Sequence, residues 1–235
     1  MKLKILFLPL LVSLNAFGQR YSNTDFVELK KSNMDSIKKL LPENRPVREF
    51  SVTTKNNDIE IVALAKEKSE VTLEVENGSL IGIDHGEWGG KIEFLNKVTG
   101  QRALIKEGNV KFIFRYQGKT YFLEGLAHLS TNEGAMYRLD YDGDVFTPVK
   151  LIDFEDAPQA IFVDNDVLYI AGFSNFFVVK NLSKEKVFPN TMWTGQYPNS
   201  VAVADERRVY VGFREGYAKL DIRDRTIRYF VYLGK

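Results

Sequence analysis

The chain of 235 residues contains no cysteine and has only two histidines and two tryptophans. Without cysteine there is no disulfide, no thiolate metal ligand, no cysteine nucleophile and no lipid-modified N-terminal cysteine. The sequence also lacks a serine nucleophile elbow and a glycine-rich phosphate-binding loop. These absences exclude disulfide-stabilised secreted scaffolds and several common classes of enzyme.

A long hydrophobic run is also missing. Residues 5–14 form a mainly apolar run interrupted by Pro9, but a membrane-spanning helix needs about twenty apolar residues. Lys2 and Lys4 precede this run, and Ala16 and Gly18 follow it directly before Gln19. This order of charge, apolar run and small residues predicts a secretory signal peptide over residues 1–18 and a periplasmic or secreted protein without a membrane span. A retained N-terminal anchor is the alternative.

The charge of the chain is close to neutral. It has 32 Lys and Arg against 31 Asp and Glu, a formal net charge of +1. Removal of residues 1–18 takes away Lys2 and Lys4, so 30 basic residues face 31 acidic ones and the formal charge becomes −1. A near-neutral chain has no electrostatic attraction for nucleic acid or an anionic membrane surface, so we predict neither as a partner.

An internal repeat is the strongest signal of architecture. Residues 158–173 return as residues 198–213, about forty positions later. Each copy begins with proline, runs through an apolar strand and a hairpin, and ends in Tyr-x-x-Gly or Tyr-x-Gly followed by phenylalanine. A period of this length is typical of propeller blades.

The strands expected from residue 71 onward fall into four groups of four. Hairpin signals separate the strands of the first two groups at Asn77-Gly78, Thr99-Gly100, Gln117-Gly118 and Asp142-Gly143. Asn-Gly favours a tight turn because both central residues take positive φ. In front of these groups, residues 48–55 and 58–66 read as two further strands, and residues 23–41 have the apolar spacing of an amphipathic helix. We therefore predict a helical extension over residues 19–45 and a β domain over residues 46–235.

Through these repeated units, residues 71–235 resemble the β-propeller superfamily. The Trp-Asp and kelch signatures are absent, so the resemblance is to the architecture and to no named family within it. It implies an all-β fold of four four-stranded blades, or five if the strands of residues 48–66 supply another blade. A β-sandwich with regular hairpins is the alternative fold.

Superposition of the four groups places one polar residue at equivalent loop tips. His85, His128, Asn175 and Glu215 each follow the glycine of a second strand by three positions. The propeller resemblance implies that these loops gather on one face around a central channel, where ligands commonly bind. Two imidazoles and a carboxylate suit a metal ion or acid–base chemistry, although no local ligand spacing supports a metal and polar loop tips are common. We predict no metal and no other cofactor.

Residues 82–90 hold the densest set of chemically useful side chains. Asp84, His85, Glu87 and Trp88 lie between glycines, and an exposed tryptophan there can stack on a sugar or anchor a protein. The connection of residues 189–199 carries Trp193 and Tyr197 and is expected on the same face. An alternative is that Trp88 folds inward over its sheet. The predicted ligand-binding set is therefore Asp84, His85, Glu87, Trp88, His128, Asn175, Trp193, Tyr197 and Glu215.

Three classes of function follow from this pattern. The first is an exported non-catalytic binding protein that holds a protein or glycan through the face with Trp88 and Trp193; a periplasmic protein that neutralises a toxin is one example. The second is a small hydrolase or lyase that uses His85, His128 and Glu215, with or without a metal. The third is a structural component of envelope assembly. We favour the first because two tryptophans on one face would form a recognition surface.

Overall fold

The computed structural model describes residues 19–29, 46–56, 58–64, 69–191 and 193–234, which form an all-β protein. These residues contain twenty strands arranged in five antiparallel sheets. Their only helices are two three-residue 3-10 turns, Asn23–Asp25 (η1) and Gly86–Trp88 (η2). The all-β prediction is therefore confirmed.

Three of the sheets are four-stranded meanders, in which each strand pairs with the next along the chain. Sheet II consists of β5 (Glu70–Val75), β6 (Gly78–Asp84), β7 (Gly90–Asn96) and β8 (Arg102–Glu107). Sheet III consists of β9 (Val110–Tyr116), β10 (Lys119–His128), β11 (Thr131–Tyr141) and β12 (Phe146–Asp153). Sheet IV consists of β13 (Pro158–Asp164), β14 (Val167–Gly172), β15 (Phe176–Lys180) and β16 (Ser183–Phe188).

The other two sheets combine strands from distant parts of the sequence. Sheet V contains β17 (Ser200–Val203), β18 (Arg208–Phe213), β19 (Gly216–Asp221) and β20 (Thr226–Tyr232), with β2 (Phe26–Glu28) added beside β20. Sheet I contains β3 (Phe50–Lys55), β4 (Asp58–Ala63) and β1 (Arg20–Tyr21) in the order β1-β4-β3. The N-terminal segment thus completes two sheets.

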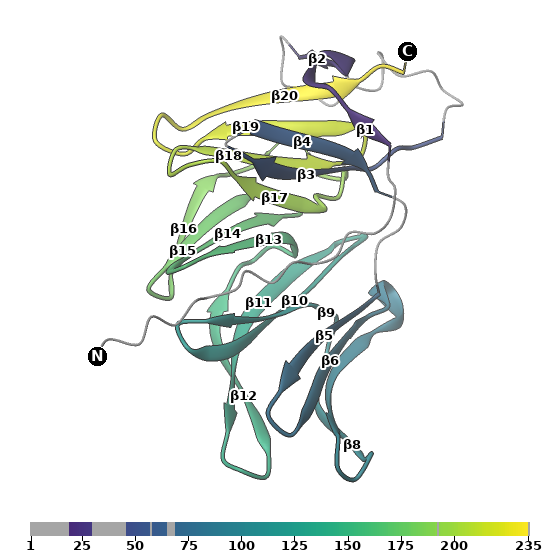
Figure 1. The fold of residues 1–235 in the computed structure, drawn as a ribbon, viewed down its shortest axis with the longest axis vertical. Coiled ribbons are helices and arrows are strands. Elements are labelled where there is room, and N and C mark those ends of the chain that lie inside the picture. Colours follow the sequence, from purple (N-terminus) through teal and green to yellow (C-terminus); the bar gives the residue numbers. More distant parts are fainter. Residues whose placement is uncertain (1–18, 30–45, 57, 65–68, 192, 235) are drawn as a thin grey trace.

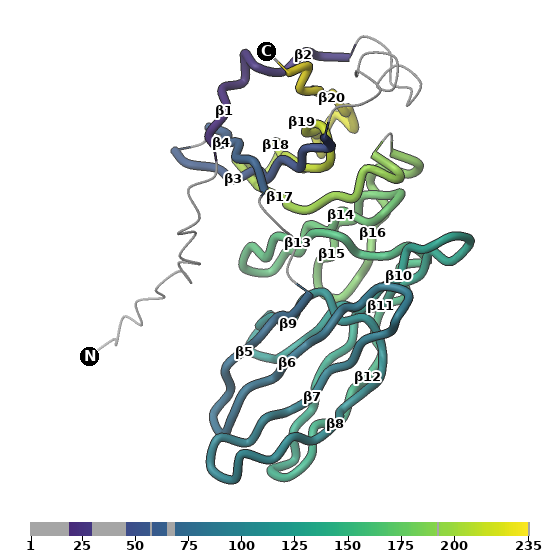
Figure 2. Tube along the Cα trace, turned by 90° about the vertical axis from the view of Figure 1, so that its right-hand side faces the viewer, coloured from purple at the N-terminus to yellow at the C-terminus, as the bar shows by residue number. Residues whose placement is uncertain are grey.

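The sheets pack face to face in one series. Four hydrophobic clusters fill the spaces between sheets II and III, III and IV, IV and V, and V and I. Figures 1 and 2 show the resulting arc, with sheet II at one end and sheet I at the other. Five sheets joined by four successive cores are consistent with a propeller-like architecture and do not fit a two-sheet sandwich.

The repeated glycine at the end of each second strand marks a point of close approach. A Cβ on Gly82 would lie 2.6 Å from Cγ1 of Val110 in the next sheet, and one on Gly125 would lie 2.8 Å from Cδ of Pro158. A Cβ on Gly212 would lie 2.2 Å from the carbonyl oxygen of Phe50. The glycine therefore lets the first strand of the following sheet pack directly against the second strand.

The hairpin signals have two different physical causes. Gln117 and Gly118 both have positive φ, 48° and 73°, as a type I′ turn requires. Gly78 has no positive φ and lies inside β6, where a Cβ would meet the carbonyl oxygen of Leu95 at 2.0 Å. The turn prediction at Asn77-Gly78 was thus right about the hairpin and wrong about why glycine is needed there.

The predicted N-terminal helix is wrong for Phe26–Glu28, which form β2. Residues 30–45, and with them most of that helix, lie outside the described residues, as does the predicted signal peptide of residues 1–18. Phe26 is buried within 5.1 Å of the ring centroids of both Phe50 and Tyr217. Pairing with β20 and this aromatic packing outweigh the helical spacing of so short a segment. No described stretch forms a helix of the length and apolar character needed to cross a bilayer.

Candidate functional site

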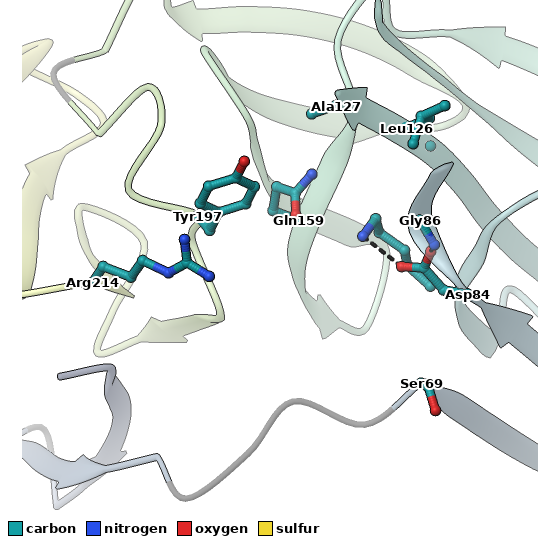
Figure 3. Close-up of a pocket in the computed structure, with 10 residues that line it drawn as sticks. Ser69, Asp84, Gly86, Leu126, Ala127, Gln159, Tyr197 and Arg214 are labelled. Carbon is teal, nitrogen blue, oxygen red and sulfur yellow. Dashed lines mark hydrogen bonds and ion pairs between the residues drawn. The ribbon is translucent and has the colours of Figure 1, made fainter. Parts of the chain in front are cut away.

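A half-open cavity of about 380 Å³ lies where loops and strand ends of sheets II to V meet. Its size is within the range of small-molecule sites. Figure 3 shows Arg214 and Tyr197 on one side of it, Asp84 and Gly86 on the other, and Gln159 between them. The lining residues come from four sheets and the connections beside them: Ser69, Asp84, Gly86, Lys111, Gly125, Leu126, Ala127, Gln159, Tyr197 and Arg214.

One side of the cavity is an ion pair between neighbouring sheets. Nζ of Lys111, on β9, lies 2.7 Å from Oδ2 of Asp84, at the end of β6. The other carboxylate oxygen of Asp84 accepts a hydrogen bond from the backbone N–H of Gly86 at 2.9 Å. The side chain of Asn109 in turn donates to the carbonyl of Gly86 at 2.8 Å. This set of bonds fixes the start of the η2 loop against sheet III.

The opposite side holds a guanidinium in a fixed orientation. Nε of Arg214, just after β18, lies 2.9 Å from Oε1 of Glu49. The guanidinium carbon lies 4.2 Å from the centroid of the Tyr197 ring, a cation–π arrangement. Tyr197 has a φ of 49°, unusual for a residue with a side chain, so its loop is held in this conformation by its surroundings. Arg214 is therefore supported on one edge and one face.

Of the predicted residues, Asp84 and Tyr197 line the cavity, and the η2 turn, whose first residue Gly86 also lines it, ends at Trp88. The Trp88 side chain is 83% exposed, so it does not fold inward over its sheet. His85 is also exposed and directly precedes η2. Nδ1 of His128 lies 3.2 Å from Oε2 of Glu87, which joins the loops of sheets II and III. The η2 loop is thus the most accessible aromatic feature beside the cavity.

The structure gives Asn175 a structural role. It is buried, and its side-chain amide donates to the carboxylate of Asp156 at 2.8 Å. The same carboxylate accepts from the backbone N–H groups of Ser174 and Asn175 and from the side chain of Asn132. Burial raises the pKa of Asp156, and these hydrogen bonds act in the opposite direction. Asn175 therefore helps to hold sheets III and IV together, and it does not line the cavity.

Glu215 and Trp193 also make structural contacts, and neither lines the cavity. Glu215 is buried, and its side chain accepts a hydrogen bond from the backbone N–H of Arg48 at 3.1 Å, next to β3. Trp193 has no exposed surface, and its indole N–H donates to the carbonyl of Gly172 at 3.1 Å. The long connection before β17 is anchored by Trp193 while Tyr197 reaches the cavity. Trp88 and Trp193 consequently do not form one recognition surface.

None of the four loop-tip residues lines the cavity. Within the described part of the chain, no three His, Asp or Glu side chains lie close enough together to hold a metal ion. His85, His128 and Glu215, the residues of the hydrolase hypothesis, therefore have no common place in this cavity.

The sequence analysis did not predict three polar side chains that line the cavity: Lys111, Gln159 and Arg214. A usable signal existed for one of them: Gln159 follows the first proline of the repeat, as Asn199 follows the second. Lys111 is the second residue of β9 and Gln159 the second residue of β13. Residues at the start of the first strand of a unit therefore line the cavity, as do residues of the loop after the second strand.

Comparisons with known proteins give little further information. No protein-family model matches the chain, and no curated protein matches it. A solved structure that does match is the crystal structure of the tricorn protease, with 11% sequence identity and a TM-score of 0.31. The match covers 79% of this chain and 26% of that one, so this chain spans about a quarter of its neighbour's length. A likeness this distant assigns no activity, and the architecture rests on the sheets themselves.

Proposed function

We propose that the chain is an exported, non-catalytic binding protein that holds a protein or glycan at the cavity and the η2 loop. The observation that carries the proposal is a cavity of about 380 Å³ bordered by a loop whose tryptophan is 83% exposed. Large exposed aromatic side chains beside a polar concavity are typical of recognition sites. Export follows from the signal-peptide pattern of residues 1–18, and we propose a periplasmic or secreted location.

For the architecture, we propose a five-bladed propeller-like arc. Sheets II to V supply four blades, and sheet I is the fifth, because β3 packs on sheet V as β17 packs on sheet IV. In this arrangement β1 and β2 attach the N-terminal segment to the last two blades. The loops between second and third strands then share one face with the cavity, which makes this face the natural binding surface.

A binding role explains the site better than hydrolysis does. Glu215 is hydrogen-bonded to the backbone of Arg48, and His85 and His128 point to no shared cavity. The paired charges Lys111–Asp84 and Arg214–Glu49 give a fixed polar lining rather than a free acid and base. A fixed lining of this kind favours ligand recognition.

The test compares Trp88→Ala with Val98→Ala. Val98 is 88% exposed and lies in the β7–β8 hairpin, at the other end of the same sheet, so it controls for loss of an exposed apolar side chain. Immobilised protein is used to capture ligands from a periplasmic extract and from a glycan array. We expect Trp88→Ala to lose at least about tenfold in affinity for the captured ligand, since a central aromatic anchor contributes about 2 kcal/mol or more, and Val98→Ala to lose none. Equal capture by all three proteins would contradict the proposal and favour a contact surface elsewhere, such as the sheet edges.

A further inference from the structure

The hydrogen-bonding capacity left open in the cavity consists mainly of donors. Asp84 already accepts from Lys111 and from the Gly86 N–H, so its two oxygens each have a partner. Lys111 uses one of its three N–H groups on Asp84, and the Tyr197 hydroxyl has no hydrogen-bond partner among the described residues. A ligand that complements this lining must therefore supply acceptors.

Arg214 is the strongest of these donors. Its Nε edge is occupied by Glu49 and one face is stacked on Tyr197, whereas its two terminal amino groups have no partner among the described residues. A guanidinium fixed in this way offers two parallel N–H groups at the spacing of a carboxylate. Because the side chain is already ordered, little rotamer freedom remains to be lost when an anion binds.

The shape and polarity of the cavity favour a small, highly hydroxylated ligand. Leu126 and Ala127 are the main apolar side chains of the lining, so an apolar peptide side chain would find little complementary surface. Gln159, with a donor and an acceptor, lies between the two charged sides of the cavity. Trp88 follows the lining residue Gly86 by two positions, and its ring is exposed. These features suit a sugar ring with a carboxylate substituent.

We propose that the cavity binds an acidic saccharide of the uronate type, with its carboxylate on the terminal amino groups of Arg214 and its hydroxyls on Lys111, Gln159 and Tyr197. This inference rests on the proposed binding function and names the ligand class of the same site. The alternative occupant, an acidic peptide, is an outcome of the test.

The experiment measures binding by titration calorimetry for uronate disaccharides of the glucuronate, galacturonate and mannuronate types. Each is compared with the neutral disaccharide of the same linkage, which lacks only the carboxylates. We expect at least one acidic member to bind at least tenfold more tightly than its neutral counterpart. The difference should disappear in Arg214→Gln and fall several-fold in Arg214→Lys, because an ammonium does not reproduce the paired donors.

Two variants keep the test informative if Arg214→Gln is unstable. Glu49→Gln/Arg214→Gln removes both partners of the ion pair, so no charge is left unpaired. Arg115→Gln removes an exposed arginine that does not line the cavity and should leave binding unchanged. Thermal unfolding of each variant confirms that it is folded.

Three results would overturn the inference. Equal binding of acidic and neutral disaccharides, with loss in Gln159→Ala, would keep the binding function and remove the role of the carboxylate. Displacement of bound uronate by a poly-glutamate peptide at equal or lower concentration would replace the saccharide by a peptide. Absence of any saccharide binding, together with protein capture that requires Trp88, would reject the saccharide and leave the proposed function intact. Capture that is independent of Trp88 is the separate result that rejects the proposed function.

Discussion

Gly82, near the end of β6, lies so close to the next sheet that a methyl group would not fit there. A Cβ at Gly82 would lie 2.6 Å from Cγ1 of Val110 and 3.0 Å from Cγ2 of Val71. Both neighbours are branched side chains in strands and have little freedom to move away. We expect Gly82→Ala to lower the free energy of unfolding by about 1–3 kcal/mol, measured by urea denaturation.

The matched variant for this prediction is Val110→Ala, which removes the atom nearest to the new Cβ. Val110→Ala alone also destabilises the protein, because Val110 is buried in the core between sheets II and III. The double variant Gly82→Ala/Val110→Ala should be more stable than the sum of the two single effects predicts. Strict additivity would show that sheet III does not approach Gly82 as closely as the structure has it.

The sequence predicted the burial of single side chains less well than it predicted the strands. Trp88 was expected to be exposed and is exposed, whereas Trp193, expected on the same face, is buried. Asn175 and Glu215 were chosen as polar loop tips, yet both satisfy backbone groups at junctions between sheets. Which side of a loop faces solvent depends on the neighbouring sheet, and a single sequence contains no local signal for it.

The short strand β2 depends on one side chain for its position. Phe26 is buried within the aromatic cluster that joins sheets V and I, whereas its neighbour Val27 is 47% exposed. Three residues of pairing with β20 cannot hold a strand without such packing. We expect Phe26→Ala to lower the free energy of unfolding by about 3 kcal/mol.

Val27→Ala provides the control, since it shortens a side chain on the same strand without opening a core. It should change the free energy of unfolding by less than about 0.5 kcal/mol. Hydrogen exchange of the β20 amides that face β2 gives a second readout, and exchange should accelerate in Phe26→Ala alone. Similar effects of the two substitutions would mean that β2 does not pack as described.

At the level of elements, the sequence predicted strands better than it predicted the segment before them. The repeat of residues 158–173 and 198–213 corresponds to β13–β14 and β17–β18, and its proline and glycine mark where neighbouring sheets touch. Residues 26–28 have apolar spacing that fits a helix as well as a strand. Their structure is decided by β20, which lies two hundred residues away, so local spacing alone gave the wrong result.

The outer faces of the two end sheets, I and II, are mainly polar, which opposes closure of the arc into a ring. The face of sheet I that points away from sheet V carries Ser51, Thr53 and Lys55, alternating with the buried Phe50 and Val52. This face offers mainly polar groups to any further sheet. Among the described residues, no hydrophobic cluster joins sheet I to sheet II.

The free face of sheet II is charged as well. Glu70, Thr72 and Glu74 of β5 are exposed, and Glu93 of β7 is covered by its ion pairs with Lys91 and Arg102. The hydrogen bond from Lys91 is the main cause that lowers the pKa of Glu93, so this carboxylate stays ionised at neutral pH. Apart from the exposed Leu104, burying such a face against a second polar face would cost desolvation energy with little hydrophobic gain. The molecule is therefore expected to remain an open arc in solution.

The absence of cysteine makes this expectation directly testable. Thr53 and Thr72 lie on the free faces of sheets I and II, and both are exposed, so Thr53→Cys/Thr72→Cys introduces the only two thiols of the chain. In an open arc both thiols should react with maleimide, and a short bismaleimide should not join them. Thr53→Cys/Glu60→Cys is the positive control, because Thr53 and Glu60 are direct partners across β3 and β4. Efficient cross-linking of residues 53 and 72 with the short reagent would show that the first and last sheets meet, and that the ring is closed by polar contacts.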